Sequence, residues 1–167
     1  VNFTTQDGLA NSRVEVICHA VDGSMWFGMK KGGVSRYDGK KVVNFTMRDG
    51  FVSNEIHAVH RAADGTLWFG GVGGVSRYSR EGDIVNFTRA DGLAGDEVKS
   101  ICETADGSLW FAIYGGGVFR YDGEKFDRFT DERGLGSIWV NALDIARDGT
   151  LWAGESTYGV ARLNLTP

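Results

Sequence analysis

The residues best suited to metal chemistry in this chain are two cysteines, a histidine and an aspartate. Cys18, His60, Cys102 and Asp144 follow one another at intervals of 42 residues. If equivalent strands met around one axis, this set would offer the donor atoms that zinc prefers. No spacing typical of a known metal motif accompanies them, and unpaired cysteines are commonly buried as small apolar residues. We therefore predict no cofactor, no metal and no disulfide, with these four residues as the alternative metal set.

The other groups that could perform acid–base or nucleophilic chemistry do not form a recognisable set. His57 and His60 are three residues apart on an expected strand, so their side chains point to opposite faces. Glycines at 73–74 and 115–117 lie between expected strands rather than between a strand and a helix, so we interpret them as turn glycines and not as a phosphate loop. The sequence therefore predicts no catalytic residues and a protein that is not an enzyme.

A step of 42 residues runs through the whole chain of 167 residues. Residues that keep this step are Trp26, Trp68, Trp110 and Trp152, and the Asp-Gly pairs that begin at Asp22, Asp64, Asp106 and Asp148. Repeats of this length are typical of solenoids, propellers and arrays. We divide the chain into repeats 1-42, 43-84, 85-126 and 127-167, which together form one domain.

Each repeat is expected to form four short antiparallel strands. One repeat has segments rich in Val, Ile, Trp and Phe at 14–20, 24–28, 33–37 and 42–46, and Asp-Gly pairs separate the first segment from the second and the third from the fourth. Asp-Gly supplies the positive φ angles of a two-residue type I′ hairpin. No segment has a sustained period of 3.6 residues, so helices are not expected. The predicted fold class is all-β: β-propeller blades, with the four periodic tryptophans buried between neighbouring blades.

The repeat resembles the two-component regulator propeller repeat, the blade found in sensor regions of bacterial hybrid histidine kinases. The resemblance rests on 22–28 (DGSMWFG) and 33–39 (GVSRYDG), and the pattern recurs from Asp64, Asp106 and Asp148. The last repeat departs from it, with Ala153-Gly154 in place of Phe-Gly. The resemblance implies a sensor module in the periplasm or outside the cell. Members usually carry rings of seven blades in larger proteins, whereas this sequence has four blades and no kinase segment.

The phase of the repeat predicts how the last blade is completed. Val1 to Thr4 matches the fourth strand of a repeat, whereas the last repeat reaches only a third strand at 160–165. Because an unpaired sheet edge favours association, we expect the N-terminal strand to complete the last blade. The pairing could lie within one chain, giving a monomeric ring of four blades. It could also join two chains in a homodimer with eight blades and twofold symmetry, which we favour because large aromatic residues on the second strands suit wide rings.

A ligand site is expected where the repeats differ. The loops before the first strand of each blade and the loops between its second and third strands open at the same end of the ring. Charged and aromatic residues gather in these loops: Arg13, Lys30, Lys31, Glu55, Glu97, Tyr114, Trp139 and Tyr158. Variable loops on a repeated scaffold are a common place for binding residues. Trp139 is the one tryptophan outside the 42-residue step, so we predict that its ring stacks on a ligand.

Composition restricts the function further. The net charge of −4 at pH 7 argues against nucleic acid as a partner, and no apolar segment approaches the roughly 20 residues needed to cross a membrane. We predict a non-catalytic ligand-binding or interaction propeller, such as a sensor for a carbohydrate or a peptide. Two alternatives stay open. One is a lyase similar to the streptogramin lyases, and the other is a half-propeller whose one property is self-assembly.

Overall fold

The chain folds into four antiparallel sheets that follow one another along the sequence. The computed structural model describes residues 2–95, 97–129, 134–163 and 165. Each sheet is a meander, so strands that are consecutive in sequence are neighbours in the sheet. The strands are β1 (Val14–His19), β2 (Met25–Met29), β3 (Val34–Tyr37), β4 (Val42–Phe45), β5 (Ile56–Arg61), β6 (Leu67–Gly71), β7 (Gly74–Tyr78), β8 (Ile84–Phe87), β9 (Glu97–Glu103), β10 (Leu109–Tyr114), β11 (Gly117–Tyr121), β12 (Phe126–Phe129), β13 (Val140–Ile145), β14 (Leu151–Glu155) and β15 (Gly159–Leu163). The first three sheets have four strands, and the described strands of the last are three.

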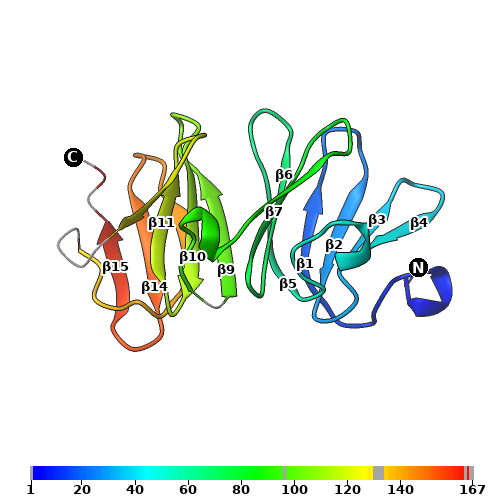
Figure 1. The fold of residues 1–167 in the computed structure, drawn as a ribbon, viewed down its shortest axis with the longest axis horizontal. Helices are drawn as coiled ribbons and strands as arrows, with labels where there is room; N and C mark the ends of the chain where they lie inside the picture. Colours follow the sequence, from blue (N-terminus) through cyan, green and yellow to red (C-terminus); the bar gives the residue numbers. More distant parts are fainter. Residues whose placement is uncertain (1, 96, 130–133, 164, 166–167) are drawn as a thin grey trace.

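The sheets stack side by side as blades do in a propeller. The first strands of neighbouring sheets contact one another, β1 against β5, β5 against β9 and β9 against β13. Figure 1 shows that the stack is open: the sheet that contains β1 and the sheet that contains β15 lie at opposite ends of the long axis. We call the four sheets blades 1 to 4 in chain order. The all-β fold built of propeller-like blades is therefore confirmed.

The turns between strands differ from the type I′ hairpins that we predicted. Among the described residues no residue other than glycine has a positive φ, so Asp22 cannot occupy the first central position of a type I′ turn. Instead the Gly23 amide donates to the Ala20 carbonyl at 3.1 Å and Gly23 has φ 82°, as in a type I turn followed by a glycine bulge. The Asp22 carboxylate accepts from the Ser24 amide at 2.9 Å. The aspartate thus fixes the turn through its side chain.

Three short 3-10 helices occur among the described residues, one before each of blades 1, 2 and 3, although no helices were predicted. They are η1 (Thr5–Asp7), η2 (Met47–Asp49) and η3 (Arg89–Asp91). Each begins with a capping box, in which a threonine side chain accepts a backbone hydrogen bond and an aspartate three residues later bonds the threonine amide. The repeated Thr-x-x-Asp-Gly pattern was the signal for these turns. No helix among the described residues is long and apolar enough to cross a membrane.

The periodic tryptophans form the core between blades, with one exception. Trp26, Trp68 and Trp110 are 2%, 3% and 2% exposed, and each packs against the blade that follows. Trp68, for example, lies 5.8 Å from the ring of Phe111 and 5.5 Å from that of Tyr121. Trp152 was predicted to be equally buried, but it is 40% exposed. The reason is that blade 4 has no following blade in this structure.

The N-terminal strand does not complete blade 4 within the chain. Residues 2–4 belong to no strand, and Figure 1 places the N-terminus at the opposite end of the stack from β15. The expected pairing of Val1 to Thr4 with residues 160–165 in one chain is therefore absent from this structure, as is the closed ring of four blades. Val1 and Asn164 lie outside the described residues.

Candidate functional site

Each blade carries the same irregularity at the start of its innermost strand. The pairing of this strand with its neighbour skips one residue, between Val14 and Val16 in β1 and at the equivalent place in β5, β9 and β13. Such a β-bulge leaves one residue out of the ladder and redirects its side chain. The bulged residues are Glu15, His57, Lys99 and Asn141, again 42 residues apart. The repeat thus presents four different polar groups along the inner face of the stack.

A second set of residues lies two positions before the bulges. This set is Arg13, Glu55, Glu97 and Trp139, which the sequence already indicated. In blades 2 and 4 a serine fixes the approach of the chain: Ser53 Oγ accepts from the Glu55 amide, and Ser137 Oγ accepts from the Trp139 amide, each at 3.0 Å. Local side chain–backbone bonds of this kind set the entry to a strand.

Members of these two sets, together with Lys30, form a continuous polar row from blade 1 to blade 3. Lys30 forms a hydrogen-bonded ion pair with Glu55, and Lys99 forms an ion pair with Glu97. Between the two carboxylates lies His57, whose Nε2 is 3.4 Å from Glu55 Oε1 and 3.7 Å from Glu97 Oε2. We call Lys30, Glu55, His57, Glu97 and Lys99 the polar row. Its two lysines and two glutamates balance in charge.

His57 is the buried centre of the polar row. Its side chain is 8% exposed, and its Nε2 has no hydrogen-bond partner among the described residues. Burial and, second, the charge of Lys99 lower the pKa of His57 below its ordinary value, against the opposing effect of Glu97 and Glu55. The hydrogen bond from Lys30 lowers the pKa of Glu55. The centre of the row at neutral pH is therefore a neutral imidazole that lies between the side chains of Glu55 and Glu97.

Aromatic side chains continue the row from blade 3 to blade 4. Lys99 Nζ lies 5.8 Å from the centre of the Tyr114 ring, and this ring lies 4.7 Å from that of Trp139. The backbones of Tyr114 and Trp139 also pair through an isolated β-bridge. Trp139 is 40% exposed, so a large aromatic surface is open beside hydrogen-bonding groups. Such a combination suits ligands with both apolar and polar faces.

The structure brings five of the eight sequence-predicted site residues into one continuous surface: Lys30, Glu55, Glu97, Tyr114 and Trp139. Arg13 lies at the edge of this surface and bonds Glu15 at 2.7 Å. Lys31 and Tyr158 are exposed in their loops, and neither contacts the row in an interaction that we observe among the described residues. That these eight residues bind a ligand remains a prediction.

Sequence reasoning missed His57 and Lys99. Both follow an indicated glutamate by two residues, and both occupy a position where the four repeats read Glu, His, Lys and Asn directly after an apolar residue. The sequence alone predicted regular alternation along the strand, whereas the β-bulge interrupts this alternation and redirects the side chain of the bulged residue. A comparison of the repeats at every position would have found this variable polar site.

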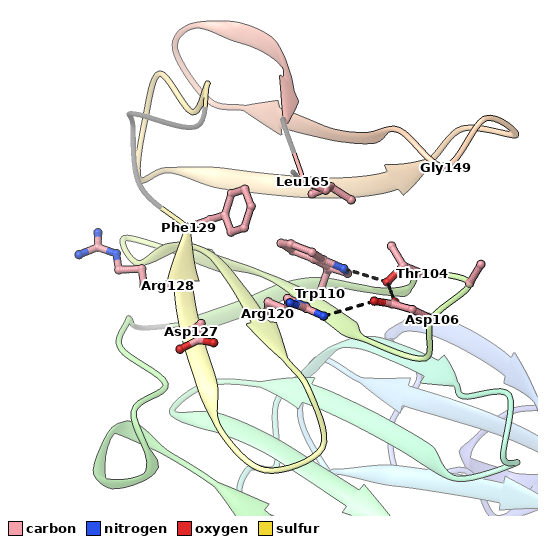
Figure 2. A pocket seen from close by; sticks show the side chains of 10 residues that line it. Thr104, Asp106, Trp110, Arg120, Asp127, Arg128, Phe129, Gly149 and Leu165 are labelled. Atoms are coloured by element: carbon pink, nitrogen blue, oxygen red, sulfur yellow. Dashed lines mark hydrogen bonds and ion pairs between the residues drawn. The ribbon is translucent and has the colours of Figure 1, made fainter. Parts of the chain in front are cut away.

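Among the described residues, a cleft opens at each of the three blade junctions, on the side of the blades that carries the Asp-Gly turns. They measure about 400, 370 and 670 Å³ in order along the chain. In the largest, Arg120 bonds Asp106 at 3.2 Å and the Trp110 indole donates to Thr104 Oγ1 at 3.2 Å. Figure 2 shows Phe129 and Leu165 facing the same space, with Arg128 turned away. Because its Trp, Arg and Asp occupy repeat-equivalent positions, we attribute this cleft to the blade geometry.

The residues of the alternative metal set do not converge. Cys18 packs at the junction of blades 1 and 2, and Cys102 at that of blades 3 and 4. His60 Nε2 lies 3.5 Å from Glu103 Oε2 instead. Burial and, to a lesser extent, Asp144 raise the pKa of the Cys102 thiol to about 12, which is opposite to the shift that a metal ligand requires. Both cysteines are free, and no metal-binding group of side chains occurs among the described residues.

The fold and its repeated blades place the chain in the β-propeller class. Within that class, the family model of the two component regulator propeller matches residues 92–115. Over these residues the resemblance seen in the sequence is confirmed. No curated protein matches the sequence.

Solved structures of two kinds are similar. The extracellular domain assigned to the hybrid two component system BT4673 of B. thetaiotaomicron has a TM-score of 0.80 at 18% identity, over 99% of this chain and 23% of that one. The corresponding domain of BT3049 gives 0.74 at 23% identity, over 84% and 20%. Virginiamycin B lyase from Staphylococcus aureus, solved with quinupristin, gives 0.74 at 19% identity, over 99% and 55%. The chain thus spans about a fifth of the sensor domains and about half of the lyase, and the similarity establishes the fold.

Proposed function

We propose that this chain is a non-catalytic ligand-binding unit of an extracellular or periplasmic sensor. The observation that carries the proposal is the polar row, which continues through Tyr114 to the exposed ring of Trp139. This surface lies where the repeats differ, whereas the scaffold residues around it repeat. The similar sensor domains of two component systems support the assignment to signalling and to the outside of the cell.

A carbohydrate is the ligand that this surface fits best. The charges of the row are paired with one another, so the surface offers hydrogen-bonding groups without a net charge that would select an ionic ligand. The exposed face of Trp139 can stack on the apolar C–H face of a sugar ring. A peptide is the second ligand class, since backbone amides can use the same polar groups.

The test is a binding screen with two tryptophan variants. Neutral oligosaccharides and short peptides are screened against the wild type, and the affinity of each hit is measured by calorimetry. Trp139→Ala should weaken binding at least about fivefold, because an aromatic contact contributes about 0.5–1.5 kcal/mol beyond area burial. Trp152→Ala is the matched control, since both tryptophans are 40% exposed in blade 4 but Trp152 lies away from the row.

The outcomes distinguish a ligand site at the polar row and Trp139 from a ligand site in the cleft of Figure 2. Binding that is weakened by Trp139→Ala and unchanged by Trp152→Ala supports the proposal, and the class of the hits decides between carbohydrate and peptide. A ligand that ignores Trp139→Ala but is lost on Asp106→Ala would place the site in the cleft of Figure 2 and overturn the proposal.

A lyase is the second candidate function. The observation in its favour is His57, a neutral imidazole held between two carboxylates, which is a suitable general base. Incubation with quinupristin followed by mass spectrometry tests this candidate. Product that forms with the wild type but not with His57→Gln would support the lyase, and an unchanged substrate would exclude this reaction.

A further inference from the structure

The centre of the polar row holds one buried histidine among four charged side chains. We propose that His57 is a proton switch for the ligand surface. When it is protonated, its imidazolium displaces Lys99 from Glu97. The displaced lysine then leaves its place beside the aromatic part of the surface, formed by Tyr114 and Trp139. This inference names a regulation of the proposed ligand site and rests on that proposed function, but the switch itself operates in the protein without a ligand.

His57 differs from the other bulged residues in having an unbonded polar atom. The other three side chains each hold a close partner: Glu15 accepts from Arg13 at 2.7 Å, Lys99 forms an ion pair with Glu97, and Asn141 donates to Ser156 Oγ at 2.8 Å. The His57 side chain is 8% exposed, yet its Nε2 has no hydrogen-bond partner among the described residues. A buried polar atom without a bond is costly and rare. The row therefore has an unused hydrogen-bonding group at its centre.

Both oxygen atoms that face the imidazole already hold a lysine. Glu55 Oε1 lies 3.4 Å from His57 Nε2 and is the atom that pairs with Lys30. Glu97 Oε2 lies 3.7 Å from the same nitrogen and is the atom that pairs with Lys99. An imidazolium carries a positive charge and donates from both ring nitrogens, so it competes with each lysine for the same oxygen atom. Protonation therefore exchanges partners within the row.

Lys99 is the lysine that yields. Lys30 is hydrogen-bonded to Glu55, whereas the contact of Lys99 with Glu97 is an ion pair. Of the two lysines, Lys99 also opposes the protonation of His57 more strongly. Because this repulsion is mutual, a charged His57 acts on Lys99 more than on Lys30.

The charged groups that face His57 come from three parts of the fold. They are Glu55, directly before β5, Glu97 and Lys99, both in β9, and Lys30, directly after β2. The strand paired with β5 inside blade 2 is β6, which contains no titratable residue. From blade 1, Glu15 and Arg13 act on Lys30 and bind each other. Burial and, second, the charge of Lys99 lower the pKa of His57, so its charged form is populated on the acid side of about pH 6.5.

Lys99 connects the switch to the aromatic surface. Its Nζ lies 5.8 Å from the centre of the Tyr114 ring, and that ring lies 4.7 Å from the ring of Trp139. While the ion pair with Glu97 holds, the lysine is ordered beside these rings. Once released, it has to be ordered again when a ligand binds, which lowers the affinity. Acid pH is therefore expected to weaken the binding of a neutral ligand.

Nuclear magnetic resonance of the protein without ligand tests the switch. The ring C–H shift of His57 and the indole N–H shift of Trp139 are followed from about pH 8 to about pH 4.5, and both should change with one midpoint below about 6.5. The signals are assigned from their loss in His57→Gln and Trp139→Phe. In His57→Gln the Trp139 shift should no longer show this transition. His60→Gln is the matched control, because it removes another partly buried histidine of β5, and it should leave both midpoints unchanged.

Two lysine variants test the role of Lys99. Lys99→Gln removes a positive charge that faces His57, so the His57 midpoint should move to higher pH, while the Trp139 shift should stop following it. Lys31→Gln removes an exposed lysine from the neighbouring loop and should change neither signal. Three results would each overturn the proposal. They are a His57 that stays neutral over the whole range, a wild-type Trp139 shift that is constant or has another midpoint, and a Trp139 transition that persists in Lys99→Gln.

Calorimetry tests the regulation of the ligand site. For each neutral oligosaccharide that the binding screen identifies, the wild type should bind about two- to tenfold more weakly at about pH 5 than at about pH 7.5, because one more side chain has to be ordered. His57→Gln should bind equally at both pH values. Equal binding by the wild type would refute the regulation while the proposed function stands. If no oligosaccharide or peptide binds, the proposed function fails and the regulation with it, whereas the titration without ligand still decides the switch.

Discussion

The interior position of Trp68 gives the sharpest stability prediction. This side chain is 3% exposed and contacts aromatic rings on two blades: Phe87 at 5.5 Å, Phe111 at 5.8 Å and Tyr121 at 5.5 Å. Trp68→Ala should lower the free energy of unfolding by about 3–5 kcal/mol, because the lost transfer energy is accompanied by a cavity that the rigid sheets cannot fill. Trp68→Phe keeps an aromatic ring in the same place and should lose about half as much.

Trp139→Ala is the comparison, because Trp139 is 40% exposed and its observed ring contact is with Tyr114. A smaller buried area and a site open to solvent reduce the expected loss to about 1–2 kcal/mol. Urea unfolding followed by far-ultraviolet circular dichroism measures the three variants, with the slope m checked for constancy. Equal losses for Trp68→Ala and Trp139→Ala would show that the blade junction is not where the stability of this stack resides.

Three further outcomes follow from the structure. Since burial lowers the pKa of His57 below 6.5, the unfolded state binds the proton first as the pH falls, so the free energy of unfolding should decrease below about pH 6.5. His57→Gln should reduce this pH dependence when the free energy of unfolding is measured by urea titration at several pH values. The same pH dependence in the variant and the wild type would contradict the prediction. Gly70→Ala would place a Cβ 2.6 Å from Val98 Cγ1 of the next blade and should lower the free energy of unfolding by about 1–3 kcal/mol. Gly154→Ala, at the equivalent open position of blade 4, should lower it little. Similar melting temperatures for the two variants would refute this prediction. Asp106→Ala removes acceptors of a turn amide and of an arginine, so a loss of about 1–2 kcal/mol is expected in thermal unfolding, and no loss would show that the turn holds without its side chain.

The repeat in the sequence was sufficient to predict the blades. The spacing of Trp26 and its equivalents, and the Asp-Gly pairs between short β-rich segments, specify strands, turns and the surfaces that pack. These features are local or repeat at one fixed step, so each repeat gives the same information again. The type of turn was predicted less well, because an Asp-Gly pair fits two hairpin geometries, and the Asp22 side chain bond that selects one is a contact in space.

The polar row and the two open ends were decided by the tertiary structure. The sequence placed Glu55 and Glu97 in separate loops, but only the packing of β5 against β9 puts both within 4 Å of His57. Likewise the sequence treated Trp152 as identical to Trp68, since their local surroundings repeat. Their burial differs because exposure depends on what lies beyond a blade, and that neighbour is not encoded in the blade's own residues. Local sequence therefore specifies each sheet here, whereas the order of the sheets in space determines which charges meet and which apolar faces remain uncovered.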